Sequence, residues 1–101
     1  MVKLEIKTTA KNDLAEIALY LKENFAEEAY LKLKADFDKL FHTLQKFPQS
    51  GVTKTHFKPF SFIVVNNYYV FYLFENNTII IQRILHTARN CIKILKLHSF
   101  I

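Results

Sequence analysis

Glycine, proline and cysteine are scarce in this sequence, and tryptophan is absent. The 101 residues include one Gly, two Pro and one Cys. Because so little linker material is present, we expect a single domain that spans residues 1–101. The lone Cys91 excludes an internal disulfide. Small secreted domains usually depend on several disulfides, so a reducing compartment is favoured.

Long apolar runs are also missing. No run approaches the roughly 18 residues that a membrane-spanning helix requires. Residues 1–6 alternate charged and apolar side chains and therefore do not resemble the apolar core of a signal peptide. We expect a soluble, cytoplasmic protein that makes no use of a membrane.

Hydrophobic and basic residues are abundant. Half of the chain is hydrophobic, with ten Phe and five Tyr, which indicates a packed core and not a disordered tail. The formal net charge is +5 and the pI is about 9.4. This excess favours an anionic partner such as nucleic acid, an acidic protein or a phosphate-rich assembly, although a basic solvated surface would produce the same count.

The first quarter of the chain predicts a strand followed by a helix. Val2–Lys7 alternates apolar and charged residues, as a half-buried strand does. Thr8 and Thr9 are suited to cap a helix that runs to about Asn24, with Asp13 in its first turn. The apolar stripe of this helix consists of Leu14, Ile17, Ala18 and Leu21.

A second helical pattern follows directly. Its apolar residues are spaced 3, 4, 3, 4 and 3 apart: Tyr30, Leu33, Phe37, Leu40, Leu44 and Phe47. The short connection to the first helix predicts an antiparallel hairpin, and a free coiled-coil dimer is the alternative. Pro48 and Gly51 are expected to end the helix.

The period changes to two beyond residue 57. The segments Phe60–Val65, Tyr68–Phe74 and Ile79–His86 are rich in aromatic and β-branched residues and are separated by Asn-Asn pairs. They predict a three-stranded antiparallel meander, whose edge Val2–Lys7 can join. Residues 87–97 predict a short C-terminal helix, capped by Thr87 or Asn90. The expected fold class is therefore α+β, with an N-terminal strand and a helical hairpin packed on a mostly antiparallel sheet.

Both faces of this sheet are predicted to be apolar. Strict alternation places Ile79, Ile81 and Leu85 on one face of the last strand and Ile80 and Ile84 on the other. One helical hairpin covers only one face. The second face must be covered by the C-terminal helix or by another protein chain.

Arg83 is the most unusual polar residue, because it lies within an apolar strand. A buried guanidinium requires a partner. That partner is either a carboxylate on one of the helices or an anion on the open face, where Lys54, His56 and Lys58 would also converge. Alternation places Arg83 and His86 on opposite faces unless the strand bulges or ends between them.

Other reactive constellations are missing from the sequence. It has no Gly-rich phosphate loop and no paired Cys or His motif, so we expect neither a cofactor nor a metal. Cys91 fits a small buried residue better than a nucleophile.

Four segments together resemble the RelE/ParE toxin superfamily and span nearly the whole chain. They are residues 10–17 (A-x-x-D-L-x-x-I), 44–51 (L-x-x-F-P-x-x-G), 69–72 (Y-V-F-Y) and 79–89 (I-x-I-x-R-I-L-H-x-x-R). The resemblance implies a bacterial type II toxin that a cognate antitoxin wraps and silences. The two apolar sheet faces and the charge of +5 predict that the free protein is poorly soluble or self-associates.

The resemblance leaves the mechanism open. The R-I-L-H-x-x-R ending is more similar to the ParE branch, which implies a poison of DNA gyrase. The alternative is a RelE-like, metal-free endonuclease that cleaves mRNA on the ribosome, with His86 and Arg83 as its catalytic residues. Target-binding or nucleic-acid-binding residues would be Lys54, His56, Lys58 and Arg89. A homologue without toxicity is the third reading, so whether the protein is an enzyme stays open.

Overall fold

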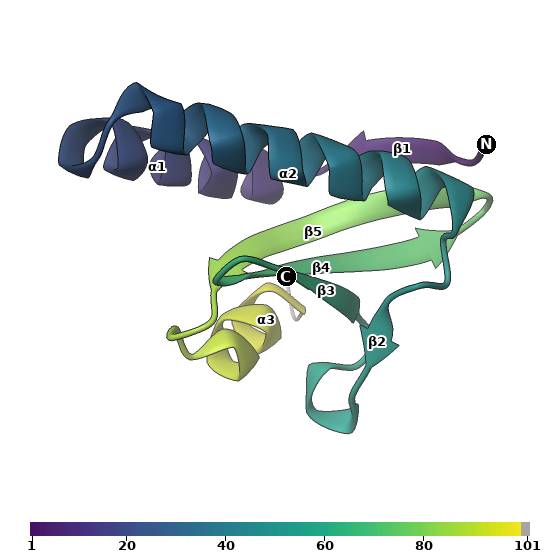
Figure 1. Ribbon diagram of the computed structural model, residues 1–101. Helices are drawn as coiled ribbons and strands as arrows, with labels where there is room; N and C mark the ends of the chain where they lie inside the picture. The colour runs from purple at the N-terminus through teal and green to yellow at the C-terminus, as the bar shows by residue number, and fades with distance from the viewer. Residues whose placement is uncertain (100–101) are drawn as a thin grey trace.

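The computed structural model describes residues 1–99, with side chains described through Lys96, and shows an α+β fold (Figure 1). The elements in chain order are β1 (Lys3–Ile6), α1 (Thr8–Asn24), α2 (Glu27–Lys46), β2 (Val52–Thr53), the 3₁₀ turn η1 (Thr55–Phe57), β3 (Ser61–Val65), β4 (Tyr68–Glu75), β5 (Thr78–His86) and α3 (Cys91–Ser99). The predicted strands and long helices are confirmed to within about two residues at each end. None of the described helices is long and apolar enough to cross a membrane.

The sheet has five strands in the order β1-β5-β4-β3-β2. Strands β3, β4 and β5 form the predicted antiparallel meander, and β1 pairs in parallel with β5 at the edge. The turns depend on asparagine, because Asn66, Asn76 and Asn77 adopt positive φ angles of 52°, 52° and 58°. The two-residue strand β2, which extends the other edge, was not predicted.

The helices α1 and α2 lie side by side across one face of the sheet (Figure 1). The predicted intramolecular hairpin is thus confirmed over the coiled-coil dimer. The buried residues on this side are mostly aliphatic: Ala10, Leu33, Phe37, Leu40, Phe41, Leu44, Val70, Tyr72, Ile79, Ile81 and Ile84. Phe47, predicted as the last member of the stripe, is 63% exposed because α2 ends at Lys46.

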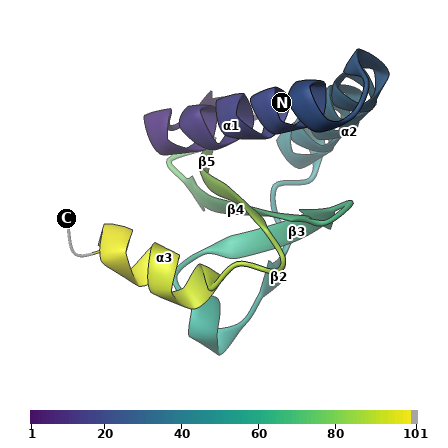
Figure 2. The ribbon, with the colours of Figure 1, turned by 90° about the vertical axis from the view of Figure 1, so that its left-hand side faces the viewer.

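The opposite face of the sheet is covered by α3 and η1 (Figure 2). Seven residues form its core: Phe57, Phe60, Phe62, Phe71, Leu85, Cys91 and Leu95. Four rings pack edge-on within this cluster; the ring of Phe57 lies 5.0 to 5.6 Å from those of Phe62, Tyr69 and Phe71. The C-terminal helix therefore covers the second apolar face, as one of the two sequence alternatives required.

The start of α3 differs from the prediction by four residues. The helix begins at Cys91 because residues 87–90 form a turn, in which the N–H of Thr87 donates to the carbonyl of Asn67 at 2.9 Å. Asn90 caps the helix, since its Oδ1 accepts a hydrogen bond from the N–H of Lys93 at 3.2 Å. Burial raises the pKa of the Cys91 thiol, which agrees with its interpretation as a packing residue.

Gly51, the only glycine in the sequence, lies where the α2–β2 connection passes β4. Its N–H donates to the hydroxyl of Tyr72 at 2.9 Å, and that hydroxyl donates to the carbonyl of Pro48 at 3.1 Å. A Cβ at Gly51 would lie 2.8 Å from two ring carbons of Tyr72. Glycine is thus required by the close approach of the ring and not by an unusual φ angle.

Candidate functional site

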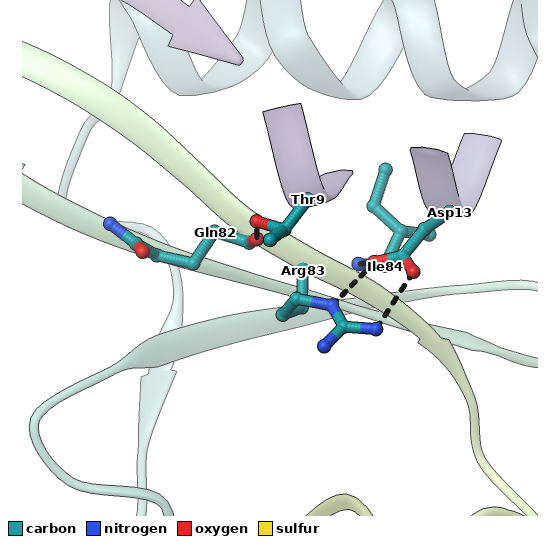
Figure 3. Close-up of polar contacts among 5 residues, drawn as sticks. All are labelled: Thr9, Asp13, Gln82, Arg83 and Ile84. Atoms are coloured by element: carbon teal, nitrogen blue, oxygen red, sulfur yellow. Dashed lines mark hydrogen bonds and ion pairs between the residues drawn. The ribbon is translucent and has the colours of Figure 1, made fainter. Parts of the chain in front are cut away.

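Arg83 and Asp13 form the central polar contact between the sheet and the helical hairpin (Figure 3). Arg83 Nε donates to Asp13 Oδ2 at 2.8 Å, and its terminal Nη2 donates to Oδ1 at 2.9 Å. The two side chains are only 13% and 7% exposed. The hydrogen bond from Arg83 to Asp13 raises the pKa of the guanidinium and outweighs the opposing effect of burial. Arg83 thus has the helix carboxylate that the structural reading of the sequence required.

Asp13 also supplies a hydrogen-bond partner to the backbone of β5 where no strand lies beside it. Strand β1 pairs with β5 only as far as Ile6 and Ile81. Beyond that point, Thr9 Oγ1 donates to the carbonyl of Gln82 at 2.8 Å, and the N–H of Ile84 donates to Asp13 Oδ2 at 2.9 Å (Figure 3). Side chains of α1 therefore replace a neighbouring strand along this edge.

The predicted capping role of the threonines is wrong for this reason. Helix α1 begins at Thr8, and its N-cap is Lys7, which makes no side-chain capping bond. Thr9 lies inside the first turn and uses its hydroxyl to bind the sheet. Asp13 lies beyond the first turn, buried against β5, so its role is an ion pair and not an interaction with the helix dipole.

A β-bulge in β5 changes which side chains share a face. Phe71 lies opposite Arg83, whereas the next residue, Tyr72, lies opposite Ile81, so Gln82 is an extra residue. The predicted alternation is therefore wrong after this point. Ile84 joins Ile79 and Ile81 in the core under the hairpin, and Leu85 joins the core under α3.

Arg83 and His86 lie on different sides of the sheet, as the alternation of the strand predicted, because the bulge precedes both residues. Arg83 borders a cavity of about 290 Å³ that Phe60 and Leu95 line from the α3 side. His86 instead lines a groove under the helical hairpin. Within residues 1–96, no hydrogen bond or ring contact joins the two side chains, so the structure does not bring the two predicted catalytic residues together.

His86 is exposed, and one of its nitrogens is engaged. The N–H of Ala88 donates to His86 Nδ1 at 3.0 Å, and the imidazole meets the ring of Tyr68 edge-on at 5.5 Å. A lone pair on Nδ1 places the proton of the neutral ring on Nε2. In the neutral side chain Nε2 is therefore a hydrogen-bond donor and not a base.

The groove beside His86 has a volume of about 570 Å³ and lies between α1, the start of α2 and the ends of β4 and β5. Its rim carries two exposed rings in edge-to-face contact, Tyr20 and Phe25, which are 55% and 61% exposed. Burial, with a smaller contribution from Tyr20, raises the pKa of Tyr68 on its floor. Arg89 lines the same groove, so the structure brings Arg89 and His86 to one place.

The remaining predicted binding residues lie on the other side of the sheet. Lys54, His56 and Lys58 are exposed on η1 and its flanking residues, on the side that α3 covers (Figure 2). They line neither the cavity beside Arg83 nor the groove of His86. The predicted set is therefore divided between two regions.

Sequence reasoning missed Asp13 as the partner of Arg83 and the aromatic rim of the groove. A signal for Asp13 was present, because Ala10, Asp13 and Ile17 share the inward-facing side of one helix. An acidic residue on that side requires a buried cation. No comparable signal marks Tyr20 and Phe25, whose proximity arises from the turn between α1 and α2.

Metal ligands do not gather in the described part of the chain: no group of three or more His, Cys, Asp or Glu side chains could hold an ion there. The arrangement therefore offers an aromatic groove with a histidine donor and an arginine, and a separate cationic region around η1.

Comparisons with known proteins agree on the nature of this fold. A family model described as the ParE toxin of the type II toxin-antitoxin system parDE matches residues 4–91. A chain of the chromosomal ParDE system from P. aeruginosa is similar in structure, with a TM-score of 0.73 and 20% identity over 85% of this chain and 96% of that chain. A copper-bound mutant toxin from Helicobacter pylori is similar with a TM-score of 0.58 and 20% identity, over 85% and 94%. At these identities the structural matches establish the fold alone, and no curated protein matches the sequence.

Proposed function

The chain belongs to the ParE toxin family of type II toxin–antitoxin systems, and on this premise we propose that it poisons DNA gyrase and is silenced by a cognate antitoxin. Gyrase acts on chromosomal DNA in the bacterial cytoplasm, so the proposal includes a cytoplasmic location. In the alternative, an endonuclease that cleaves mRNA on the ribosome, His86 would act as acid or base, and Arg83, Arg89, Lys54 or Lys58 would hold the phosphate.

The choice between a gyrase poison and a nuclease rests on the hydrogen bonds that Arg83 makes to Asp13. Its Nε and Nη2 both donate to Asp13, and the side chain is 13% exposed. A phosphate clamp would have to break this buried pair, which typically costs several kcal/mol. The bond that His86 Nδ1 accepts from Ala88 also leaves Nε2 as a donor in the neutral ring, whereas a general base must accept the 2′-OH proton. Both contacts favour a toxin that acts by binding its target over one that transfers protons.

The groove supplies the surface for the antitoxin. The second sheet face, which the sequence left open for a partner, is occupied by α3. Several exposed apolar side chains lie on the hairpin, where Tyr20 and Phe25 rim the groove. An amphipathic antitoxin segment that folds on binding would bury these rings and approach Arg89 with an acidic residue.

The test compares two assays on three proteins: the wild type, His86→Ala and His42→Ala. His42 is an exposed histidine on α2 and serves as the matched control. We expect the purified wild type to inhibit gyrase supercoiling without ribosomes, and we expect His42→Ala to do the same. Co-expression with the product of the adjacent reading frame should abolish the inhibition.

The assay of mRNA cleavage on the ribosome tests the alternative mechanism. If the wild type and His42→Ala cleave mRNA on the ribosome while His86→Ala does not, and supercoiling is untouched, the protein is a nuclease and the proposal is wrong. Inactivity of the wild type in both assays would contradict the proposal as well, in favour of a homologue that has lost toxicity.

A further inference from the structure

The charges of this protein are divided unequally along the chain. Eight of the nine Asp and Glu residues precede residue 39, and the ninth is Glu75. Eight of the fourteen Lys and Arg residues follow residue 38. Because residues 1–38 form β1, α1 and the first half of α2, nearly all of the acidic residues belong to the hairpin layer and its edge strand.

The opposite layer has an exposed surface with cations and no acidic residue. We call this surface the η1–α3 face and define it by five exposed side chains of these elements and their flanking residues: Lys54, His56, Lys58, Lys93 and Lys96. The two elements form one surface because α3 packs against η1, with Phe57 and Leu95 in a common core (Figure 2). Within the described residues, none of the five takes part in an ion pair, so the positive charge of the four lysines is not neutralised locally.

The chemistry of this face suits a phosphate backbone better than a protein. Protein interfaces centre on aromatic and apolar anchors that become buried. Such anchors are exposed on the hairpin, at Leu19, Tyr20 and Phe25, whereas the η1–α3 face exposes only Ile92, at 36%, among its described large apolar side chains. A surface of unpaired lysines matches a polymer with evenly spaced negative charges.

The buried aromatic residues of this face favour a duplex over a single strand. Proteins that bind single-stranded nucleic acid stack the bases on exposed rings. Here Phe57 and Phe60 are 7% and 9% exposed, because they form the core between η1, α3 and the sheet. The lysines are therefore placed to contact phosphates, while the phenylalanine rings of this face are buried and cannot receive an unstacked base.

We propose that the η1–α3 face binds the phosphate backbone of double-stranded DNA without base specificity. This activity goes beyond the action on gyrase and does not depend on it, because the face is complete within this chain. In a cell it would hold the toxin close to the DNA on which gyrase works.

The test measures binding of the purified full-length chain to a labelled DNA duplex of about two helical turns by fluorescence anisotropy over a range of salt concentrations. Each phosphate contact contributes about 0.9 to the slope of log K against log salt. We expect the double variant Lys93→Ala, Lys96→Ala to bind more weakly and to lower this slope by about 2. The matched control is Lys32→Ala, Lys34→Ala, which removes the same charge from the exposed side of α2 and should leave the slope unchanged.

Three results would overturn the proposal. An equal effect of the two double variants would show that net charge alone drives binding. Tighter binding of a single-stranded RNA of the same length would assign the face to a different nucleic acid. Binding of poly-glutamate but not of the duplex would assign it to an acidic protein. Circular dichroism of each variant verifies folding, and gyrase is absent from the assay, so failure of the gyrase proposal would not affect the outcome.

Discussion

The two faces of the sheet are covered in different ways. Helices of 17 and 20 residues cover one face, and a helix of nine residues with a three-residue turn covers the other. The core under the long helices is mostly aliphatic. The core under the short elements is rich in phenylalanine, with rings meeting edge-on. A few large rings thus cover this face of the sheet, because α3 and η1 have too few residues to cover it with aliphatic side chains.

The outer surfaces differ as well, and the difference separates two kinds of recognition. The hairpin exposes apolar rings and carries most of the acidic residues, which suits a folding protein partner. The η1–α3 face exposes lysines above a sealed aromatic core, which suits phosphates. A single thin sheet can therefore present a protein-binding side and a nucleic-acid-binding side. The three predictions below test whether the two sides also differ in their contribution to stability.

Removing the link between the sheet and the hairpin should have the largest effect. Asp13→Ala leaves the guanidinium of Arg83 without its partner and the N–H of Ile84 without an acceptor. Breaking a buried ion pair in this way costs about 3–5 kcal/mol. We expect the free energy of unfolding, measured by urea denaturation, to fall by that amount.

The matched variant Asp13→Asn keeps one acceptor oxygen. It can still accept from Ile84 and from one nitrogen of Arg83, so its loss should be clearly smaller than that of Asp13→Ala. Equal losses for the two variants would show that the geometry of the pair does not matter. A loss below about 1 kcal/mol for Asp13→Ala would mean that Arg83 escapes to solvent, as surface pairs do.

The sequence was sufficient to predict most of this architecture, because periodicity is a local property. The spacing of Leu33, Phe37 and Leu40 predicts the buried side of α2, and all three are buried. The asparagine pairs predict the turns of the meander, since Asn tolerates the positive φ angles that Asn66, Asn76 and Asn77 adopt. These patterns depend on neighbouring residues alone.

The features that the sequence did not predict depend on contacts between distant residues. The bulge at Gln82 has no local signal, and it reverses the faces of Ile84 and Leu85. The separation of Lys54, His56 and Lys58 from His86 follows from the position of η1, a three-residue turn too short to show a period. The partner of Arg83 was predicted as a class, a helix carboxylate, but its identity required the register of α1 on β5.

The same substitution in the two cores compares them directly. Leu44, on α2, and Leu95, on α3, are 0% and 4% exposed. Replacing a buried leucine by alanine costs about 2–5 kcal/mol, and the cost is larger where the surroundings cannot close the cavity. We expect Leu44→Ala to lie in the upper half of this range and Leu95→Ala in the lower half, because a nine-residue helix can shift towards the gap more readily than the long hairpin can.

Urea denaturation of both variants measures this difference. Exposed Leu31 on α2 supplies the control, since Leu31→Ala removes the same atoms without creating a cavity and should change the free energy of unfolding by less than about 1 kcal/mol. If Leu95→Ala were the more destabilising variant, the aromatic core would be the more rigid of the two. The comparison of the faces would then be reversed.

The smallest effect concerns Tyr72, whose hydroxyl holds the loop that joins the two faces. Tyr72→Phe removes the acceptor of the Gly51 N–H and the donor to the carbonyl of Pro48, which should cost about 1–2 kcal/mol near pH 8.

Burial raises the pKa of Tyr72, and the hydrogen bonds from Gly51 and Ser61 oppose this shift only in part. The unfolded chain therefore releases the proton at about pH 10, while the folded chain still holds it. The stability that this hydroxyl contributes is complete below about pH 10 and is lost as the pH rises further. Phenylalanine cannot titrate, so the difference in unfolding free energy between the wild type and Tyr72→Phe should shrink between pH 9 and about pH 11. Urea denaturation across this range measures it, and a difference that stays constant or widens would show that the phenol is not protected by burial.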